Sequence, residues 1–434
     1  MSAEQLASNI PQQRWLRIIP PAILVYIFAY MDRVNIGFAM AGGMNEDLGM
    51  TASMAGLAAG IFFIGYLFLQ IPAGHIAAVG SAKKFIAGTI IVWGALSVCT
   101  GFVTTTTQLL VLRFALGVSE GGVFPAMLVI ISKWFPVEER ARANAFFVMN
   151  LAIASIITGP ISGWIISSWG WRYVFIVEGA VSFLLLAAWW PFIDDKPEDS
   201  KWISAAERDY LVMRREQEQV KVQSAGATTS YKEVWFNKNT WKMILFFFCY
   251  MIGILGYTMW LPTILKQLMN TGMGAVGLFS AVPYIATMIG QYLIARRSDR
   301  SGNRRGYVAL SAFGFAVCFF MVTQFRSQIW VCYAFLIGCG FFMQGFAGPF
   351  WTIAPMLFAR NVVGGALGLI NAMGNLGGFV GPFLVGWLIT QTHNTDAGLY
   401  AMAAALAIAC LTALSFPAKT AGKKTENLND SQVI

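Results

Sequence analysis

The stretches YIFAYMDRVNIGFAM (residues 26–40) and LLVLRFALGVSEGGVFPAM (residues 109–127) place acidic and basic side chains inside otherwise apolar runs. The first holds Asp32 and Arg33, and the second holds Arg113 and Glu120. A charge at membrane depth costs at least about 2.5–3.5 kcal/mol and usually marks a substrate path or a proton relay. Because both signs occur in both stretches, the sequence indicates a protein that moves an anion together with protons.

The rest of the chain repeats the apolar pattern. Its 434 residues are 57% hydrophobic and only 12% charged, whereas a soluble domain is about 25% charged. A bilayer requires about 20 apolar residues per helix, and twelve runs near that length are present: 17–40, 52–76, 85–104, 107–132, 143–168, 173–193, 241–264, 274–295, 306–325, 328–357, 362–390 and 396–417. We therefore predict an all-α membrane protein with twelve transmembrane helices in two six-helix halves.

The order of these runs predicts four segments. Residues 1–193 form an N-terminal six-helix half, 194–240 a linker of mixed charge, 241–417 a C-terminal six-helix half, and 418–434 a polar tail expected to be disordered. Gly159-Pro160 in the fifth run and Gly381-Pro382 in the eleventh are each followed by a Trp. This match favours two halves related as a parallel repeat.

The distribution of basic residues predicts the orientation. Of the 30 Lys and Arg, two lie within spans and three (Arg172, Lys266 and Arg326) fall opposite the N-terminus. All others fall on the side of the N-terminus, so the positive-inside rule places the linker and both termini in the cytoplasm. The net charge of +9 therefore does not indicate a nucleic-acid partner. No cleavable signal is evident at the start of the chain.

The charged residues of the N-terminal half can be interpreted chemically. Arg113 and Glu120 are two helical turns apart on one face, and because an Arg stays protonated, the carboxylate is the group that binds and releases a proton. We assign proton coupling to Glu120 and Asp32. A guanidinium binds a carboxylate bidentately, so Arg33 and Arg113 are the candidate substrate anchors. Tyr30 shares a face with Arg33. A structural ion pair remains the alternative for Asp32 and Glu120, and a clamp for Glu120 alone is the alternative for Arg113.

The C-terminal half has no charged residue within its spans away from their ends, but it carries neutral polar and aromatic residues. Gln344 and Trp351 are seven residues apart on one face, and Asn371 and Asn375 are four apart on another. These side chains suit the uncharged part of an organic anion, or alternatively helix–helix contacts. We interpret the N-terminal half as the site of charge and protons, and the C-terminal half as the site for the substrate's body. Glu178 in the sixth span is interpreted as structural.

Five stretches carry a family resemblance: YMDRVNIG (30–37), Y-x-x-x-Q-I-P (66–72), RFALGVSEGGVFP (113–125), W-F-P-x-E-E-R-A-R-A (134–143) and SDRSGNRR (298–305). With these, the chain resembles the anion:cation symporter family of the major facilitator superfamily, which includes bacterial permeases for sugar acids, tartrate, phthalate and 4-hydroxyphenylacetate. The resemblance covers the chain through residue 417. It implies that Arg33 faces the cavity and that Tyr66, Gln70, Trp351 and Asn371 contact substrate. It also implies a gating loop with Asp299, Arg300 and Arg304.

Two departures from the family pattern bear on function. The loop between spans 2 and 3, GHIAAVGSAKK (74–84), carries Lys83 and Lys84 but no acidic residue, which puts its gating role in question. Leu151 stands where sugar-acid members have a hydroxyl-binding Gln. We therefore favour a carboxylate with an aromatic ring or few hydroxyls over an aldonate-type sugar acid, which remains the alternative.

These observations predict a transporter and exclude most other classes. We expect proton-coupled uptake of a small organic carboxylate by a monomer in the bacterial inner membrane. An anion exchanger or an uncoupled facilitator is the alternative. A membrane-embedded enzyme is disfavoured, because His75 and His393 both lie at span ends and no cluster of His, Cys and carboxylates occurs. No P-loop occurs either, the six Cys form neither a metal motif nor a disulfide framework, and no cofactor or metal is expected.

Overall fold

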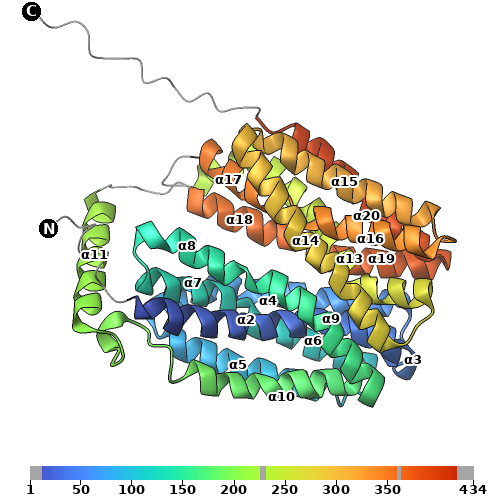
Figure 1. The fold of residues 1–434 in the computed structure, drawn as a ribbon, viewed down its shortest axis with the longest axis horizontal. Coiled ribbons are helices and arrows are strands. Elements are labelled where there is room, and N and C mark those ends of the chain that lie inside the picture. The colour runs from blue at the N-terminus through green and yellow to red at the C-terminus, as the bar shows by residue number, and fades with distance from the viewer. Residues whose placement is uncertain (1–11, 225–230, 359–362, 418–434) are drawn as a thin grey trace, which may run out of the picture.

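The computed structural model describes residues 12–224, 231–358 and 363–417, and within them every regular element is a helix (Figure 1). Twelve described helices are long and apolar enough to cross a membrane, which confirms the predicted fold class. The tail predicted to be disordered, 418–434, lies outside the described residues.

The N-terminal half is the blue-to-green bundle of Figure 1. It comprises α2 Gln13–Ala39, η1 Met40–Met44, α3 Asn45–Asp47, α4 Ala52–Val79, α5 Ala82–Thr100, α6 Thr106–Gly121, α7 Val123–Trp134, α8 Val137–Val148, α9 Asn150–Trp169 and α10 Arg172–Trp189. The linker contributes η2 Pro197–Asp199, α11 Ala205–Ser224 and α12 Tyr231–Phe236.

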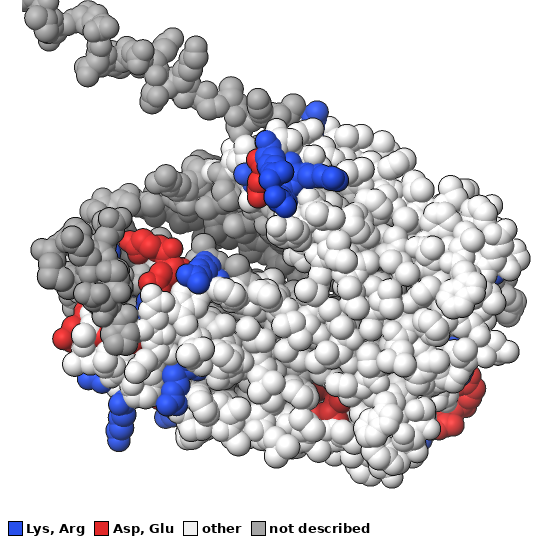
Figure 2. Space-filling model, viewed as in Figure 1, with Lys and Arg blue, Asp and Glu red and all other residues white. Residues whose placement is uncertain are grey.

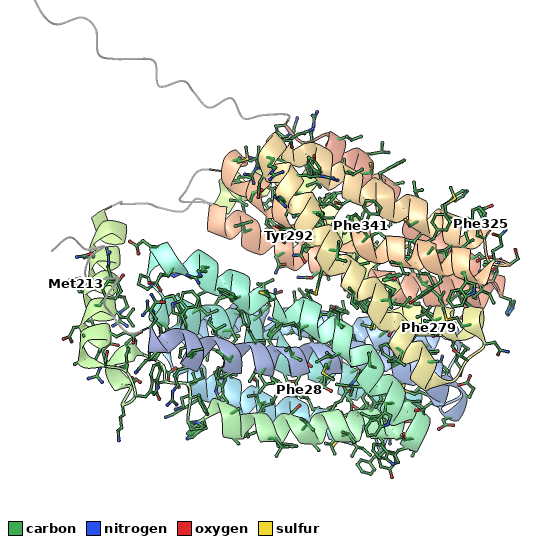
Figure 3. All side chains as sticks on the ribbon, viewed as in Figure 1. Phe28, Met213, Phe279, Tyr292, Phe325 and Phe341 are labelled. Carbon is green, nitrogen blue, oxygen red and sulfur yellow. The ribbon has the colours of Figure 1, made fainter. Side chains whose placement is uncertain are left out.

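The C-terminal half is the yellow-to-red bundle. It comprises α13 Lys238–Met269, α14 Met273–Ser301, α15 Arg304–Gln324, α16 Ile329–Met343, α17 Ala347–Leu357, α18 Val363–Asn375, α19 Gly377–Thr392 and α20 Thr395–Leu414. Large apolar side chains such as Tyr292 on α14, labelled in Figure 3, are exposed on the outside of the bundle. These are the surfaces that a bilayer would cover.

Four spans that the sequence predicts as single helices are interrupted in the structure. The breaks fall at Gly122 between α6 and α7, Met149 between α8 and α9, Gln344–Phe346 between α16 and α17, and Leu376 between α18 and α19. They affect the fourth and fifth spans of each half. Interruption at equivalent places supports the parallel repeat, and discontinuous helices are a common feature of transporter binding sites.

The linker packs on one end of the N-terminal half, which we call the linker end (Figure 1). The Arg14 guanidinium is buried and forms ion pairs with Glu207 on α11 at 2.5 Å and with Glu139 on α8 at 2.7 Å. The Trp134 and Trp202 rings stack with their centroids 5.0 Å apart. A buried Arg satisfied by two carboxylates fixes geometry, so we expect α11 to move with the N-terminal half.

The loop between spans 2 and 3 obtains its acidic partner from elsewhere in the chain. The Asp195 carboxylate, which follows α10, accepts hydrogen bonds from Ser81 Oγ at 2.5 Å and from the Lys83 amide at 2.9 Å. Lys83 Nζ pairs with Asp194 at 3.1 Å. The first turn of α5 is therefore capped by a neighbouring carboxylate, a contact that the loop sequence alone does not indicate.

The two halves pack tightly at the end opposite the linker, which we call the far end. There α4 packs along α19 and α9 along α14. Ser53 N donates to Thr390 Oγ1 at 2.9 Å, and Lys266 Nζ donates to the Ala41 carbonyl at 2.7 Å. Figure 2 shows a hollow between the halves at the linker end, where charged side chains also gather. The structure is therefore closed at the far end and open at the linker end.

The far-end seal depends on the close approach of helix backbones at Gly56, and this supports a testable prediction. A Cβ built on Gly56 would lie 2.3 Å from the Pro382 carbonyl oxygen. Overpacking of this kind costs about 1–3 kcal/mol, so Gly56→Ala should shift the equilibrium toward a state open at the far end by roughly 5- to 150-fold. The measurement is the rate at which a water-soluble maleimide labels Ser53→Cys in a background without the native cysteines.

Gly88→Ala on α5 is the matched control, because a Cβ there meets nothing within 4 Å. It should label at the parent rate, whereas Gly56→Ala should label faster. Equal rates for both variants would show that the Gly56 contact does not limit opening.

Candidate functional site

The four charges predicted from the sequence converge inside the N-terminal half. Their exposed fractions are 1% for Asp32, 8% for Arg33, 0% for Arg113 and 1% for Glu120. Asp32 and Arg33 lie on α2, and Arg113 and Glu120 lie on α6. Charges buried to this degree require partners, so their contacts define what the site can do.

The ion pair of the site joins Arg33 to Glu120. Arg33 Nη2 lies 3.3 Å from Glu120 Oε2, a single contact between groups that could form two. Arg33 Nε and Glu120 Oε1 are both buried without a hydrogen-bond partner among the described residues. An Arg carries five N–H donors, so this guanidinium retains capacity for a second anion.

Aromatic rings surround the same guanidinium. Arg33 Cζ lies 4.7 Å from the centroid of Tyr66, 5.3 Å from that of Phe62 and 5.9 Å from that of Tyr30. Such distances are within the range of cation–π attraction. The rings hold the cation in place without neutralising it, so Tyr30, Tyr66 and Arg33 form one group. Helical spacing had suggested Tyr30 with Arg33, whereas the contact with Tyr66 comes from the structure.

The hydrogen bonds of Arg113 are not with Glu120, the partner that its spacing suggested. Its Nη1 and Nη2 donate to the backbone carbonyls of Asp32 and Arg33, at 3.0 and 3.2 Å. The sequence pairs Arg113 with Glu120, whereas the ion pair of Glu120 in the structure is with Arg33. The reason is that α6 passes close enough to α2 for the guanidinium to reach its backbone. Arg113 thus braces α2 at the two residues that carry the charges.

A second polar network, which the sequence did not reveal, surrounds Asp32. Ser97 Oγ donates to Asp32 Oδ1 at 2.8 Å, and Asn35 Nδ2 lies 3.3 Å from the same oxygen. Asn35 Nδ2 also donates to Glu178 Oε2 at 2.9 Å, and Ser162 Oγ donates to Glu178 Oε1 at 3.0 Å. The available signal was the spacing of Asn35, one turn beyond Asp32 on the same helical face.

Among the described residues, no hydrogen bond, ion pair or ring contact joins the remaining predicted residues to this centre. Gln70 Oε1 on α4 is buried without a described partner. In the C-terminal half, the Trp351 ring meets Phe247 edge-on at 5.1 Å, and Asn375 Nδ2 donates to Asn371 Oδ1 at 3.2 Å. Leu151 is half-buried on α9. The described contacts of the C-terminal candidates are within their own half, so the structure does not bring them together with Arg33.

The helix breaks are marked by polar residues. Glu120 precedes the break at Gly122, Asn150 begins α9, Gln344 follows α16, and Asn375 ends α18. Each of the four interrupted spans thus carries a carboxylate or an amide beside its break. An interrupted helix exposes backbone groups that can take part in binding.

The predicted gating loop lies at the linker end of the C-terminal half. Asp299 and Arg300 lie in the last turns of α14, and Arg304 begins α15. The turn between them has Gly302 at φ 67°, a left-handed conformation that favours glycine. Within the described residues, these three charges form no ion pair with the N-terminal half.

Other kinds of site are not supported by the described part of the chain. It holds no group of three or more His, Cys, Asp or Glu that could bind a metal ion. The six cysteines are free thiols.

Two halves of six membrane-spanning helices, hollow between them at one end, with paired charges inside one half, define a membrane transport protein. The family model described as Major Facilitator Superfamily matches residues 22–282 and 268–432, and the chain belongs to this superfamily.

Curated relatives have names that refer to small organic molecules. A protein of Agrobacterium vitis named "Putative tartrate transporter" is 33% identical, over 98% of this chain and 95% of the relative. The "Quinolone resistance transporter" of Acinetobacter baumannii is 29% identical, over 95% and 96%. The "Probable galactarate/D-glucarate transporter GarP" of Escherichia coli K12 is 26% identical, over 87% and 90%.

A solved structure gives the same fold. The crystal structure of a D-xylose-proton symporter matches with a TM-score of 0.72 at 16% identity, over 93% of this chain and 98% of that one. At this identity the match concerns the fold alone.

Proposed function

We propose that this protein takes up a small organic carboxylate together with protons across the bacterial inner membrane, by alternating access. The observation that carries the proposal is the incomplete Arg33–Glu120 pair, in which a buried guanidinium and a buried carboxylate share one contact at 3.3 Å. The loop charges support placing the linker end and both termini in the cytoplasm. The protein is proposed to act as a monomer.

The pair couples proton and anion because both act on Arg33. A proton bound by Glu120 neutralises the carboxylate and weakens its contact with the guanidinium. Arg33 is then free to bind the substrate carboxylate bidentately. By linkage, the anion favours protonation of Glu120 to the same degree that the proton favours anion binding. The proton also offsets the anion's charge while the halves exchange positions.

Asp32 and Arg113 support this centre. Arg113 holds the backbone of α2 through two carbonyls, so the Arg33 side chain starts from a fixed position. Of the two guanidiniums, Arg33 is the more accessible, and we assign it the primary contact with substrate. Asp32 is proposed as a second proton-binding group.

The names of the relatives and the residues of α9 both bear on the substrate class. Two of the relatives above are named for hydroxylated diacids, which supports a small carboxylate substrate. Leu151 is apolar, and the neighbouring Asn150 donates its amide hydrogen to the Phe147 carbonyl within its own turn. At the position that binds hydroxyls in sugar-acid permeases, Leu151 therefore offers no hydrogen bond, although the neighbouring Asn150 Oδ1 is buried without a described partner. We propose an acid with few hydroxyls or an aromatic ring, with a sugar acid as the alternative.

A ligand screen tests the substrate class. Purified protein should unfold at a higher temperature in the presence of 4-hydroxyphenylacetate, whereas galactonate and galactarate, which carry many hydroxyls, should raise that temperature less. Tartrate, a short hydroxylated diacid, is tested as the intermediate case. At about one hundred times Kd a ligand adds roughly 2.7 kcal/mol of stability. Stabilisation by galactonate and galactarate alone would overturn the inference from Leu151 but keep the transporter assignment. No stabilisation by any of the four acids would argue against a carboxylate substrate.

Transport mode is decided separately. Proteoliposomes loaded with the stabilising acid are assayed for counterflow and for uptake, with and without an imposed pH gradient. Symport predicts that the substrate accumulates inside the proteoliposomes above its outside concentration only when the pH gradient is imposed. Counterflow without gradient-driven accumulation would favour the anion exchanger or the uncoupled facilitator.

A further inference from the structure

Glu178 is a buried carboxylate that the mechanism above leaves unused. It lies on α10 with 3% of its surface exposed. Its two oxygens accept hydrogen bonds from neutral donors, Asn35 Nδ2 at 2.9 Å and Ser162 Oγ at 3.0 Å. Among the described residues it forms no ion pair. Two neutral donors do not replace the hydration of a full charge.

The Asn35 amide connects Glu178 to Asp32. One nitrogen, Nδ2, lies 2.9 Å from Glu178 Oε2 and 3.3 Å from Asp32 Oδ1. The Asn35 carbonyl oxygen Oδ1 is buried and has no hydrogen-bond partner in the described chain, and the same is true of Asp32 Oδ2. A buried acceptor without a donor costs free energy. The network therefore has two buried acceptor oxygens and is short of a donor hydrogen for them.

A proton supplies that hydrogen. An amide has both a donor and an acceptor. If one carboxyl group binds a proton, its O–H can donate to Asn35 Oδ1 while Nδ2 continues to donate to the ionised partner. Two carboxylates close together disfavour double ionisation, so the arrangement fits one proton held between them.

The charges around this pair favour the same assignment. Glu178 faces Asp32 on α2 and Ser162 on α9, and the nearest cation on its own helix, Arg172, donates to the carbonyls of Gly101 and Val103. Arg113 lies near Asp32 and donates to the α2 backbone. One guanidinium near two carboxylates leaves one negative charge for a proton to neutralise.

We propose that Glu178 is a further proton-binding group, which shares one proton with Asp32 through the Asn35 amide. This rests on the proposed proton-coupled function, because the shared proton is one that the transport cycle would use. Proton binding converts one carboxylate to a carboxylic acid and needs no other reactant. The structural interpretation of Glu178 drawn from the sequence is replaced by this one.

The test is infrared spectroscopy of the purified, substrate-free protein as a function of pH. Carboxylic acids absorb in the C=O region apart from carboxylates and amides. The wild type should show pH-dependent carboxylic-acid absorption, and Glu178→Gln should remove one component of it, because Gln keeps the size of the side chain but cannot titrate. The component that belongs to Glu120 should remain. Glu46→Gln is the control, since Glu46 is an exposed carboxylate on α3 and should leave the Glu178 component in place.

A second variant keeps the proposal testable if Glu178→Gln does not fold. Ser162→Ala removes one hydrogen bond to Glu178 and should shift the frequency of the same component without abolishing it. The proposal is overturned if Glu178→Gln folds, as judged by size-exclusion chromatography, and keeps the whole absorption. It is equally overturned if Ser162→Ala leaves the frequency unchanged. Because no substrate is used, failure of proton-driven uptake in the wild type would overturn the proposed function without affecting this measurement.

Discussion

Replacement of Glu120 by Gln is expected to abolish proton-driven accumulation of substrate while retaining counterflow exchange. Gln cannot bind or release a proton, and it removes the charge that holds Arg33 Nη2 at 3.3 Å. Arg33 then remains available to the anion in every state, as if Glu120 were permanently protonated. In proteoliposomes with an imposed pH gradient, the accumulation ratio should fall to about one, because coupling requires differential affinity between states.

The direction of the pH effect distinguishes this outcome from a general loss of activity. Wild-type uptake should increase as the pH on the far-end side falls, and uptake by Glu120→Gln should not respond. Glu46→Gln serves as a control for a carboxylate outside the site. Full gradient-driven uptake by Glu120→Gln would remove Glu120 from the coupling mechanism.

The sequence predicted the fold because the physics of the bilayer acts on composition. Each apolar run near 20 residues had to become a helix, since no other isolated segment satisfies its backbone in lipid. The charges at Asp32, Arg33, Arg113 and Glu120 stood out for the same reason. Burial of these four residues in the structure agrees with their placement inside spans.

The sequence could not predict which side chains on different helices contact one another. Spacing along one helix suggested Arg113 with Glu120, but the Arg113 guanidinium donates its hydrogen bonds to the α2 backbone. Likewise the acid that caps α5 is Asp195, more than one hundred residues away from Ser81. Such contacts depend on how the helices pack, and hydrophobic periodicity contains no information about which helices are neighbours.

The helix breaks were missed for a related reason. Gly122, Met149, Gln344 and Leu376 all lie within continuous apolar sequence, and apolar runs alone cannot distinguish a straight helix from an interrupted one. Comparison of the two halves would have helped, because the breaks occur in equivalent spans. Polar residues beside them, such as Glu120 and Gln344, were noticed for their chemistry and not as markers of interruption.

Replacement of Arg33 by Lys is expected to weaken substrate binding by roughly 10–100-fold, with expression and folding retained. A Lys ammonium is a point charge and cannot donate to both oxygens of a carboxylate in the planar geometry of a guanidinium. Loss of one charge-assisted hydrogen bond costs about 1.5–3 kcal/mol, which corresponds to that change in Kd. The measurement is the Kd for the acid that stabilises the wild type most, by isothermal titration calorimetry.

Arg113→Lys distinguishes a residue that binds the substrate carboxylate from one that stabilises the backbone of α2. Arg113 is fully buried and donates to two carbonyls of α2, so its replacement should lower the thermal stability of the substrate-free protein as well as the affinity. Arg33→Lys should lower affinity with a smaller effect on stability, because its described ion pair is a single contact. If both Lys variants bind the acid with wild-type Kd, the substrate carboxylate is held elsewhere, and the polar residues at the C-terminal breaks become the candidates to examine next.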